Sequence, residues 1–364
     1  MNIKSLLIGS AAALAAVSGA QAADAIVAAE PEPLEYVRVC DAFGTGFFYI
    51  PGTETCLKFD GYIRFQTDFG RNQSGTSDWN ATTRAQFNID TRTDTELGAL
   101  RGYIGFRGQA NNDTSRGVVV DQAFIELGGL KVGYYYNWWD DGLSGEVDNL
   151  SSNFTRLNAI RYTYDAGSFY AGVAVEELEA VIAGNGALTQ TTNNLGVSQL
   201  NYTLAKGERD NNVGISAIIG GNFGAVKANL LGGYDTDAEN GAIRAIVTAD
   251  IGPGTLGLSG VWASGANAYY EESEWTVAAE YAIKATDKLT ITPGVQYFST
   301  LDINANGDFV GDRDAWRAGV AVGYKITSGL STLVSVNYQD VDGTTGVNGG
   351  GDQWTGFVRL QRSF

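Results

Sequence analysis

The stretch that decides the fold is W-T-G-F-V-R-L-Q-R-S-F, residues 354–364, in which apolar and polar residues alternate up to a terminal aromatic, Phe364. Alternation with a period of two is typical of a β-strand with two different faces. A soluble protein that ends on such a strand leaves a sheet edge open, whereas a transmembrane barrel pairs its last strand with its first. The ending therefore favours a closed barrel over the edge strand of a soluble sheet.

The other end of the chain has the features of an export signal. Lys4 precedes a short apolar run over residues 6–17, and A-Q-A at 20–22 has the pattern of a cleavage site. We expect residues 1–22 to be removed as a signal peptide. The rest of the sequence has no run of 18 or more apolar residues, so it predicts no transmembrane helix.

Composition narrows the functional classes. The chain has 48 Gly, 18 Tyr, 16 Phe and 1 Met, which is typical of an all-β protein with many turns. Its formal charge of −17 argues against nucleic acid as a partner, because phosphates require a basic surface. The sequence contains no histidine, which removes Ser-His-Asp catalysis and every His-based metal site. We expect no enzymatic activity and no cofactor.

Alternating segments fill the chain from residue 57 onward. In 57–68, Phe59, Ile63 and Phe65 share one face and Lys58, Arg64 and Gln66 share the other. Apolar faces begin and end with aromatics, as two girdles around a lipid-facing band would require. The opposite faces are too charged for a dry core, so we expect them to line water. The basic residues predicted to face the lumen are Arg64, Arg84, Arg92, Arg101 and Arg107.

Short and long connections alternate, as in outer-membrane barrels. A raw count gives seventeen strand-like segments, and parity reduces them to sixteen, because the last strand must end in the periplasm. The extra segment, 196–204, is placed inside a long external loop. The fold predicted is an all-β, 16-stranded antiparallel transmembrane β-barrel over 57–364. Eighteen strands is the alternative, if one more pair lies within 176–211.

Two cysteines, Cys40 and Cys56, lie close together in a chain with an export signal. A disulfide is the natural interpretation, contributing about 3 kcal/mol for a loop of about 15 residues. Two free buried thiols are the alternative. We expect residues 23–56 to form an N-terminal periplasmic segment that contains this disulfide.

The chain resembles the general porins of alphaproteobacteria, the Brucella–Rhizobium type. The resemblance covers the whole chain and is carried by four stretches: M-N-I-K-S-L-L-I-G-S-A-A-A-L at the start, the block from Glu35 to Leu57, K-V-G at 131–133, and the ending F-V-R-L-Q-R-S-F. It implies a homotrimer of 16-stranded barrels that admits small hydrophilic solutes by passive diffusion. The ending also resembles the C-terminal signal by which outer-membrane barrels are recognised for assembly, with Phe364 as its terminal aromatic.

The resemblance also implies that one loop folds into the lumen. General porins fold the connection after the fifth strand inward, which here is 137–156. This connection carries four carboxylates: Asp140, Asp141, Glu146 and Asp148. Acid on the loop facing arginine on the wall would create a transverse field in a narrow passage. The alternative is that the carboxylates are surface charge and that the arginines pair locally with Asp60 or Asp90.

One loop has the spacing that starts a calcium-binding EF-hand loop. Asp302, Asn304, Asn306 and Asp308 alternate as such ligands do, but the glutamate expected at the twelfth position is Arg313. Calcium is a weak candidate here, and no other metal site is predicted.

Three functions remain open. The first is a general porin in the bacterial outer membrane, in contact with lipid and lipopolysaccharide and passing small solutes and ions. The second is a substrate-selective channel, in which Tyr62, Tyr103 and Tyr135 could line the lumen. The third is a soluble exported adhesin or binding protein. Dependence on detergent for extraction separates the third from the others, and single-channel conductance separates the first two.

Overall fold

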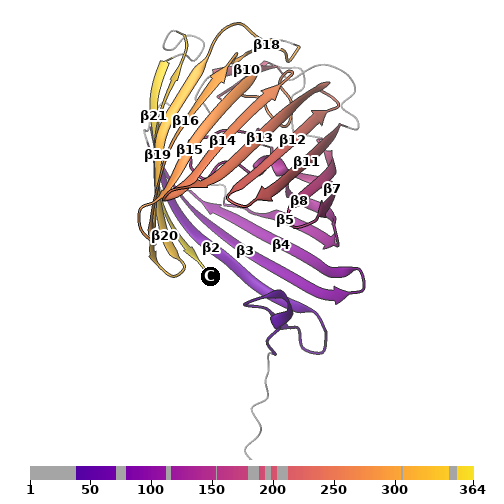
Figure 1. The fold of residues 1–364 in the computed structure, drawn as a ribbon. Coiled ribbons are helices and arrows are strands. Elements are labelled where there is room, and N and C mark those ends of the chain that lie inside the picture. Colours follow the sequence, from indigo (N-terminus) through magenta and orange to yellow (C-terminus); the bar gives the residue numbers. More distant parts are fainter. Residues whose placement is uncertain are drawn as a thin grey trace, which may run out of the picture.

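The structure of the protein is a computed structural model, which is drawn as a ribbon in Figure 1. It describes residues 38–70, 79–111, 116–152, 154–178, 188–192, 198–202, 212–304, 306–343 and 351–364. Among these residues, no helix is long and apolar enough to cross a membrane.

Sixteen antiparallel strands form the barrel. They are β2 (Cys56–Phe69), β3 (Trp79–Thr95), β4 (Gly98–Ala110), β5 (Val118–Leu127), β6 (Leu130–Tyr136), β7 (Arg156–Asp165), β8 (Phe169–Glu177), β11 (Val213–Phe223), β12 (Val226–Asp235), β13 (Asn240–Ile251), β14 (Gly254–Ala263), β15 (Trp275–Lys284), β16 (Leu289–Ser299), β19 (Ala315–Thr327), β20 (Leu330–Val341) and β21 (Gly351–Ser363). Shorter elements are the 3-10 helices η2 (Asp41–Phe43) and η3 (Trp138–Asp140) and the strands β1 (Phe48–Tyr49), β9 (Leu188–Thr192), β10 (Ser198–Tyr202), β17 (Asp302–Ile303) and β18 (Phe309–Val310).

The barrel closes between its last strand and its first. β21 pairs with β2 from Tyr62↔Ser363 to Phe69↔Gly356. The terminal residue extends this ladder, because the Phe364 N–H donates to the Gly61 carbonyl at 3.1 Å. The sequence-based prediction of sixteen strands, closed by residues 354–364, is confirmed. The described part of the segment 196–204, strand β10, is outside the barrel as expected, since among the described residues it pairs with β9 in a separate two-stranded sheet.

The two faces of each strand follow the alternation of the sequence. On β2, Ile63 and Phe65 point outward and are 52% and 50% exposed, while Arg64 between them points inward. On β19, Trp316 and Tyr324 mark the two ends of the outward face, with exposures of 43% and 42%. An apolar outer surface of this extent would be unfavourable in water but suits a lipid environment. The barrel therefore has the outer face of a membrane protein.

Connections at the two ends of the barrel differ in length. At one end the turns are short and several carry glycine with positive φ, as at Gly128 (59°) and Gly329 (68°), a backbone that glycine adopts without strain. At the other end the connections are long, apart from 236–239. That short connection begins at the fully buried Asp235, whose Oδ1 accepts from the N–H groups of Asp237 and Ala238. We call these the turn end and the loop end.

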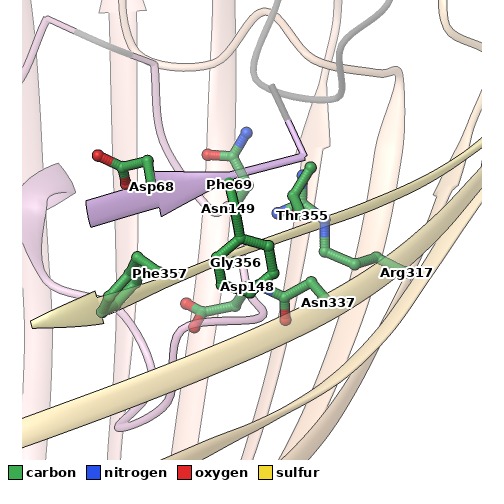
Figure 2. A pocket seen from close by; sticks show the side chains of 9 residues that line it. All are labelled: Asp68, Phe69, Asp148, Asn149, Arg317, Asn337, Thr355, Gly356 and Phe357. Atoms are coloured by element: carbon green, nitrogen blue, oxygen red, sulfur yellow. The ribbon is translucent and has the colours of Figure 1, made fainter. Parts of the chain in front are cut away.

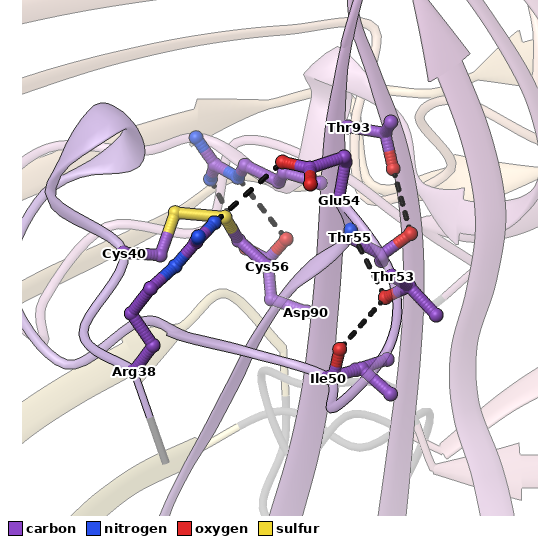
Figure 3. The surroundings of a disulfide bond; sticks show 10 residues. Arg38, Cys40, Ile50, Thr53, Glu54, Thr55, Cys56, Asp90 and Thr93 are labelled. Carbon is purple, nitrogen blue, oxygen red and sulfur yellow. Dashed lines mark hydrogen bonds and ion pairs between the residues drawn. A yellow bond between two sulfur atoms is a disulfide. The ribbon is translucent and has the colours of Figure 1, made fainter. Parts of the chain in front are cut away.

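The described part of the N-terminal segment, residues 38–56, lies at the turn end, below β2 and β3 in Figure 1. The expected disulfide between Cys40 and Cys56 is present, with Cα atoms 6.0 Å apart and both residues fully buried (Figure 3). Thr55 and Thr93 also share a hydrogen bond of 3.0 Å, which attaches the segment to β3. The alternative of two free thiols is excluded. The predicted signal peptide, residues 1–22, lies outside the described residues. Both this peptide and the division of the chain at residue 56 stay predictions.

Candidate pore constriction

The connection between β6 and β7, residues 137–155 without the undescribed residue 153, folds into the lumen, and we call it the constriction loop after the role predicted for it. Its two ends are held together because the Asn137 N–H donates to the Thr155 carbonyl at 2.7 Å. The Asn137 side chain accepts from the Trp139 N–H at 3.0 Å and caps the short helix η3. Strand β6 has only seven residues, so the loop leaves the wall early and turns into the lumen rather than over the rim.

A buried arginine fastens the start of the loop to the far wall. Arg244 on β13 is 1% exposed, and its guanidinium donates to the carbonyls of Trp138 (2.7 Å), Trp139 (2.8 Å) and Leu150 (3.3 Å). It also lies over the Trp139 ring at 5.1 Å. Hydrogen bonds from a charged donor are stronger than neutral ones. One side chain therefore holds the outgoing and returning limbs of the loop against the same strand.

The tip of the loop reaches across the lumen to β21. The Glu146 carboxylate is 3.3 Å from Arg359, and its carbonyl accepts from Asn337 on β20 at 3.3 Å. Between tip and base, the Gly145 N–H donates to Glu280 on β15 at 2.6 Å, and Gln296 on β16 exchanges two hydrogen bonds with the Asn149 backbone. The loop therefore contacts the wall from β13 to β21, and the open part of the lumen lies between the loop and β2–β7.

A second connection, residues 264–274 between β14 and β15, packs on the constriction loop. The Ser152 hydroxyl donates to the Ala268 carbonyl at 2.5 Å, and the rings of Trp139 and Tyr269 lie 5.6 Å apart. The Tyr269 hydroxyl donates to the buried Glu176 of β8 at 2.6 Å. Burial raises the pKa of the Tyr269 hydroxyl, so it stays protonated and keeps this bond.

A cavity of about 260 Å³ separates the tip of the loop from the wall (Figure 2). Asp148 and Asn149 contribute to it from the loop, and Arg317 contributes from β19. Arg317 also donates to the Val147 carbonyl at 3.1 Å and to Gln339 at 3.1 Å. Separate polar contacts therefore hold the loop, and a cavity remains between part of the loop and the wall.

The four loop carboxylates occupy different positions. Asp140 and Asp141 are exposed, and Asp140 accepts from the Thr155 hydroxyl at 2.6 Å. Glu146 is ion-paired at the tip with Arg359. Asp148 accepts from the Leu143 N–H at 3.0 Å and lines the cavity behind the loop. Only the first two are therefore placed as free charges on the loop surface.

The five wall arginines divide into two groups. Arg92 and Arg101 both bind Asp90, with closest distances of 3.0 and 2.9 Å. Arg107 binds the buried Asp121 at 2.9 Å. Local pairing with Asp90, an alternative considered from the sequence, describes Arg92 and Arg101. Arg107 is also paired, but with Asp121 rather than with Asp60 or Asp90.

Arg64 and Arg84 make the other group. They are directly opposite each other on β2 and β3. Within the described parts of the chain, neither forms an ion pair with a carboxylate. The Arg64 Nε donates to Gln361 on β21 at 2.8 Å. Arg359, on the same strand, donates to Gln66 at 2.7 Å and reaches Glu146, so the cluster of three arginines faces the loop tip.

Sequence reasoning missed the residues that position the loop. Arg244, Arg317, Arg359 and Gln296 each lie at an inward position of an alternating strand, which the pattern could have revealed. Their binding partners lie on the loop about 100 to 200 residues away in sequence, as backbone carbonyls for Arg244, Arg317 and Gln296 and as the Glu146 carboxylate for Arg359. No local pattern identifies such partners.

The calcium candidate forms a hydrogen-bonded hairpin, β17–β18. Asp302 is 2.7 Å from Arg313, and the Asn304 side chain accepts from the N–H groups of Asn306 and Asp308. No group of three or more Asp, Glu, Cys or His side chains that could hold a metal ion occurs in the described part of the chain. These contacts favour a plain turn, although calcium binding itself stays untested.

Known proteins agree with this architecture. The model of the porin subfamily matches residues 24–358. This chain belongs to the porin subfamily. It is 50% identical over 342 residues to outer membrane protein IIIA of Rhizobium leguminosarum bv. viciae, covering 93% of this chain and 90% of that protein. It is 36% identical to porin Omp2b of Brucella neotomae, and the alignment covers 100% of both chains.

Solved structures share the fold at low identity. The outer membrane channel DcaP of Acinetobacter baumannii has a TM-score of 0.60 at 15% identity, covering 87% of this chain and 99% of that one. The trimer form of OmpT, an outer membrane protein of Vibrio cholerae, has a TM-score of 0.58 at 14% identity, covering 86% and 100%. The family and the fold together make this porin an outer-membrane β-barrel, as its alternating sequence indicates.

Proposed function

We propose that this porin is a general diffusion pore for small hydrophilic solutes and ions. The observation that carries the proposal is the constriction loop, which crosses the lumen of a closed barrel and leaves open the side lined by charged strands. A lumen lined by charged side chains holds water, so polar solutes keep their hydration there. Apolar solutes gain nothing from such a passage.

We further propose that charge on the two sides of the opening sets ion selectivity. Asp140 and Asp141 supply free negative charge on the loop, while Arg64 and Arg84 supply positive charge on the wall. Glu146 and Asp148 contribute less, because the first is paired and the second lies behind the loop. Three wall arginines also contribute less because each is ion-paired with a carboxylate: Arg92, Arg101 and Arg107. Unpaired charges in a narrow passage act over a longer range than charges in bulk water.

The test is charge reversal on the loop. Asp140→Lys together with Asp141→Lys should move the reversal potential in a KCl gradient towards anion selectivity and change the single-channel conductance. Asp287→Lys, in a short turn at the other end of strand β15, is the matched control and should change neither by much. If the loop variant keeps the wild-type reversal potential and conductance, these carboxylates do not line the constriction.

A substrate-selective channel remains the second candidate. The tyrosines considered for a lumen ladder do not favour it: Tyr135 is 1% exposed, and Tyr103 stacks on Phe124 with ring centroids 5.0 Å apart. Rings that are packed on each other offer no continuous track for a sugar. Conductance that saturates with one sugar and not with others would support selectivity over general diffusion.

The assembly is also part of the proposal. Full-length relatives are porins and outer membrane proteins, and one neighbour of the same fold is described in a trimer form. We therefore propose a homotrimer in contact with outer-membrane lipid and lipopolysaccharide, with residues 1–22 cleaved on export. Phe364 would serve as the assembly signal, since its 59% exposed ring remains accessible at the end of β21.

A further inference from the structure

Two cations lie side by side on the lumen wall on the turn-end side of the constriction loop. Lys131 is the second residue of β6, just after the Gly128–Gly129 turn, and Arg161 is its direct partner on β7. Both point inward and are partly exposed. Like charges directly opposite each other in a sheet are unfavourable. The two opposed cations therefore do not help the protein to fold. A local arrangement that is unfavourable for folding indicates a functional position.

The aromatic residues behind these cations hold them in place. The Lys131 ammonium lies 3.7 Å from the centroid of Phe124 and 4.6 Å from that of Tyr135. The Arg161 guanidinium lies 4.9 Å from the rings of both Tyr135 and Trp138. Cation–π contacts orient a charge but do not neutralise it. The rings also remove water from one side of each cation, which strengthens its attraction for an anion.

Gly133 makes this arrangement possible. Its φ of 136° lies in the region that favours glycine, and a Cβ there would meet the Ala123 carbonyl at 2.3 Å and the Phe124 Cα at 2.8 Å. The absence of a side chain lets the Phe124 ring pass between Lys131 and Tyr135. The K-V-G motif at 131–133 therefore builds the aromatic support for the cation.

The carboxylates on the adjacent strands β5 and β8 are already engaged. Glu126, opposite Lys131 on β5, is 3.3 Å from Arg101. Glu176 on β8 accepts from the hydroxyls of Tyr269 and Ser216. Neither Lys131 nor Arg161 forms an ion pair with a carboxylate of the described residues. The two cations are therefore available to a solute.

We propose that Lys131 and Arg161 form a binding site for the oxyanion of a small solute, a carboxylate or a phosphate group, on the periplasmic side of the constriction. The ammonium and the guanidinium supply several donors to one anion, and the guanidinium can bind two of its oxygens at once. Aromatic solutes are not favoured, because the cations themselves cover the rings, leaving Phe124 7% and Tyr135 1% exposed. The site rests on the proposed open lumen but not on the charges of the constriction.

The test uses inorganic phosphate, with acetate as the carboxylate probe. In planar bilayers, phosphate added to chloride solutions should reduce the conductance of the wild-type trimer saturably. Lys131→Gln with Arg161→Gln should raise the half-blocking concentration roughly tenfold, whereas Lys131→Arg should keep it near wild type. Lys227→Gln is the matched control, because it removes one lumen cation on β12, away from the pair. A lower half-blocking concentration for acetate than for phosphate would identify carboxylates as the preferred solutes.

Broadening of the phosphorus NMR signal of phosphate by folded protein in detergent gives a second measurement that needs no conductance. It should be present in the wild type and the Lys227→Gln control and lost in the double variant. Equal half-blocking concentrations in the wild type and the double variant, or broadening that survives in the double variant, would overturn the site. Failure of the wild type to conduct would instead contradict the proposed pore, and the NMR result would still decide the site.

Discussion

Removal of the Arg244 side chain should release the constriction loop without unfolding the barrel. Arg244→Leu leaves the carbonyls of Trp138, Trp139 and Leu150 without the donor that they have now. A buried acceptor left without a partner costs about 1–3 kcal/mol. Three such acceptors cost at least about 3 kcal/mol, which shifts the balance between seated and detached loop roughly 150-fold. The strand pairing of β13 uses backbone groups and stays intact.

Two measurements follow the loop directly. Single-channel recordings of Arg244→Leu should show a larger mean conductance and more open-channel noise, because a detached loop narrows the lumen only part of the time. Chymotrypsin should also cut within 138–154, which contains Trp, Leu and Phe residues but few that are exposed in the seated loop. Lys227→Leu, which removes a lumen cation from the adjacent strand β12, is the control and should change neither property. Wild-type conductance, noise and protease resistance in Arg244→Leu would refute this account of how the loop is held.

Three further results are expected. Val247→Arg places a charge on the outward face of β13 and should make folding into the membrane less favourable by about 2–4 kcal/mol at mid-membrane. Thr248→Arg places its charge in the lumen and should fold with near wild-type yield. Equal loss of heat-resistant trimer in both variants would contradict the assigned faces. Arg84→Gln should shift the reversal potential towards cations more than Arg92→Gln, because Arg92 is ion-paired with Asp90 whereas Arg84 has no such pair among the described residues. The opposite order would mean that the ion-paired arginines determine the selectivity. The double variant Cys40→Ser with Cys56→Ser should have a free energy of unfolding about 3 kcal/mol lower than the wild type and an unchanged conductance. Alkylation of two thiols in unreduced wild-type protein would refute the disulfide in the cell.

The strands and their faces were predictable because alternation is a local signal. Ile63 and Phe65 face outward and Arg64 faces inward, as the letters alone indicate, and the parity of the connections was enough to give sixteen strands. The position of the constriction loop followed from resemblance to general porins rather than from its residues. The contacts that hold the loop against the wall could not be predicted in the same way, because Arg244 and Gln296 bind backbone groups of the loop. Every residue has such backbone groups, so the sequence does not indicate which of them are bound.

The pairing of the charged side chains in the lumen is the feature that the sequence predicts least well. Five inward arginines look equivalent in the sequence, yet three of them are ion-paired: Arg92 with Asp90 on its own strand, and Arg101 and Arg107 with Asp90 and Asp121 on neighbouring strands, through contacts that depend on register. The same register places Arg92 opposite Arg101, which share Asp90, and it leaves two like-charged pairs without an ion pair to a described carboxylate, Arg64 opposite Arg84 and Lys131 opposite Arg161. Both pairs point into the lumen, and the Trp138 ring of the constriction loop packs on Arg161 at 4.9 Å. The solute path therefore meets unpaired positive charge twice, once beside the loop tip and once near the periplasmic exit, although the whole chain carries a net charge of −17. The net charge sums all ionisable groups of the chain. The strand register, in contrast, determines which of these charges are unpaired along the lumen, where a solute passes.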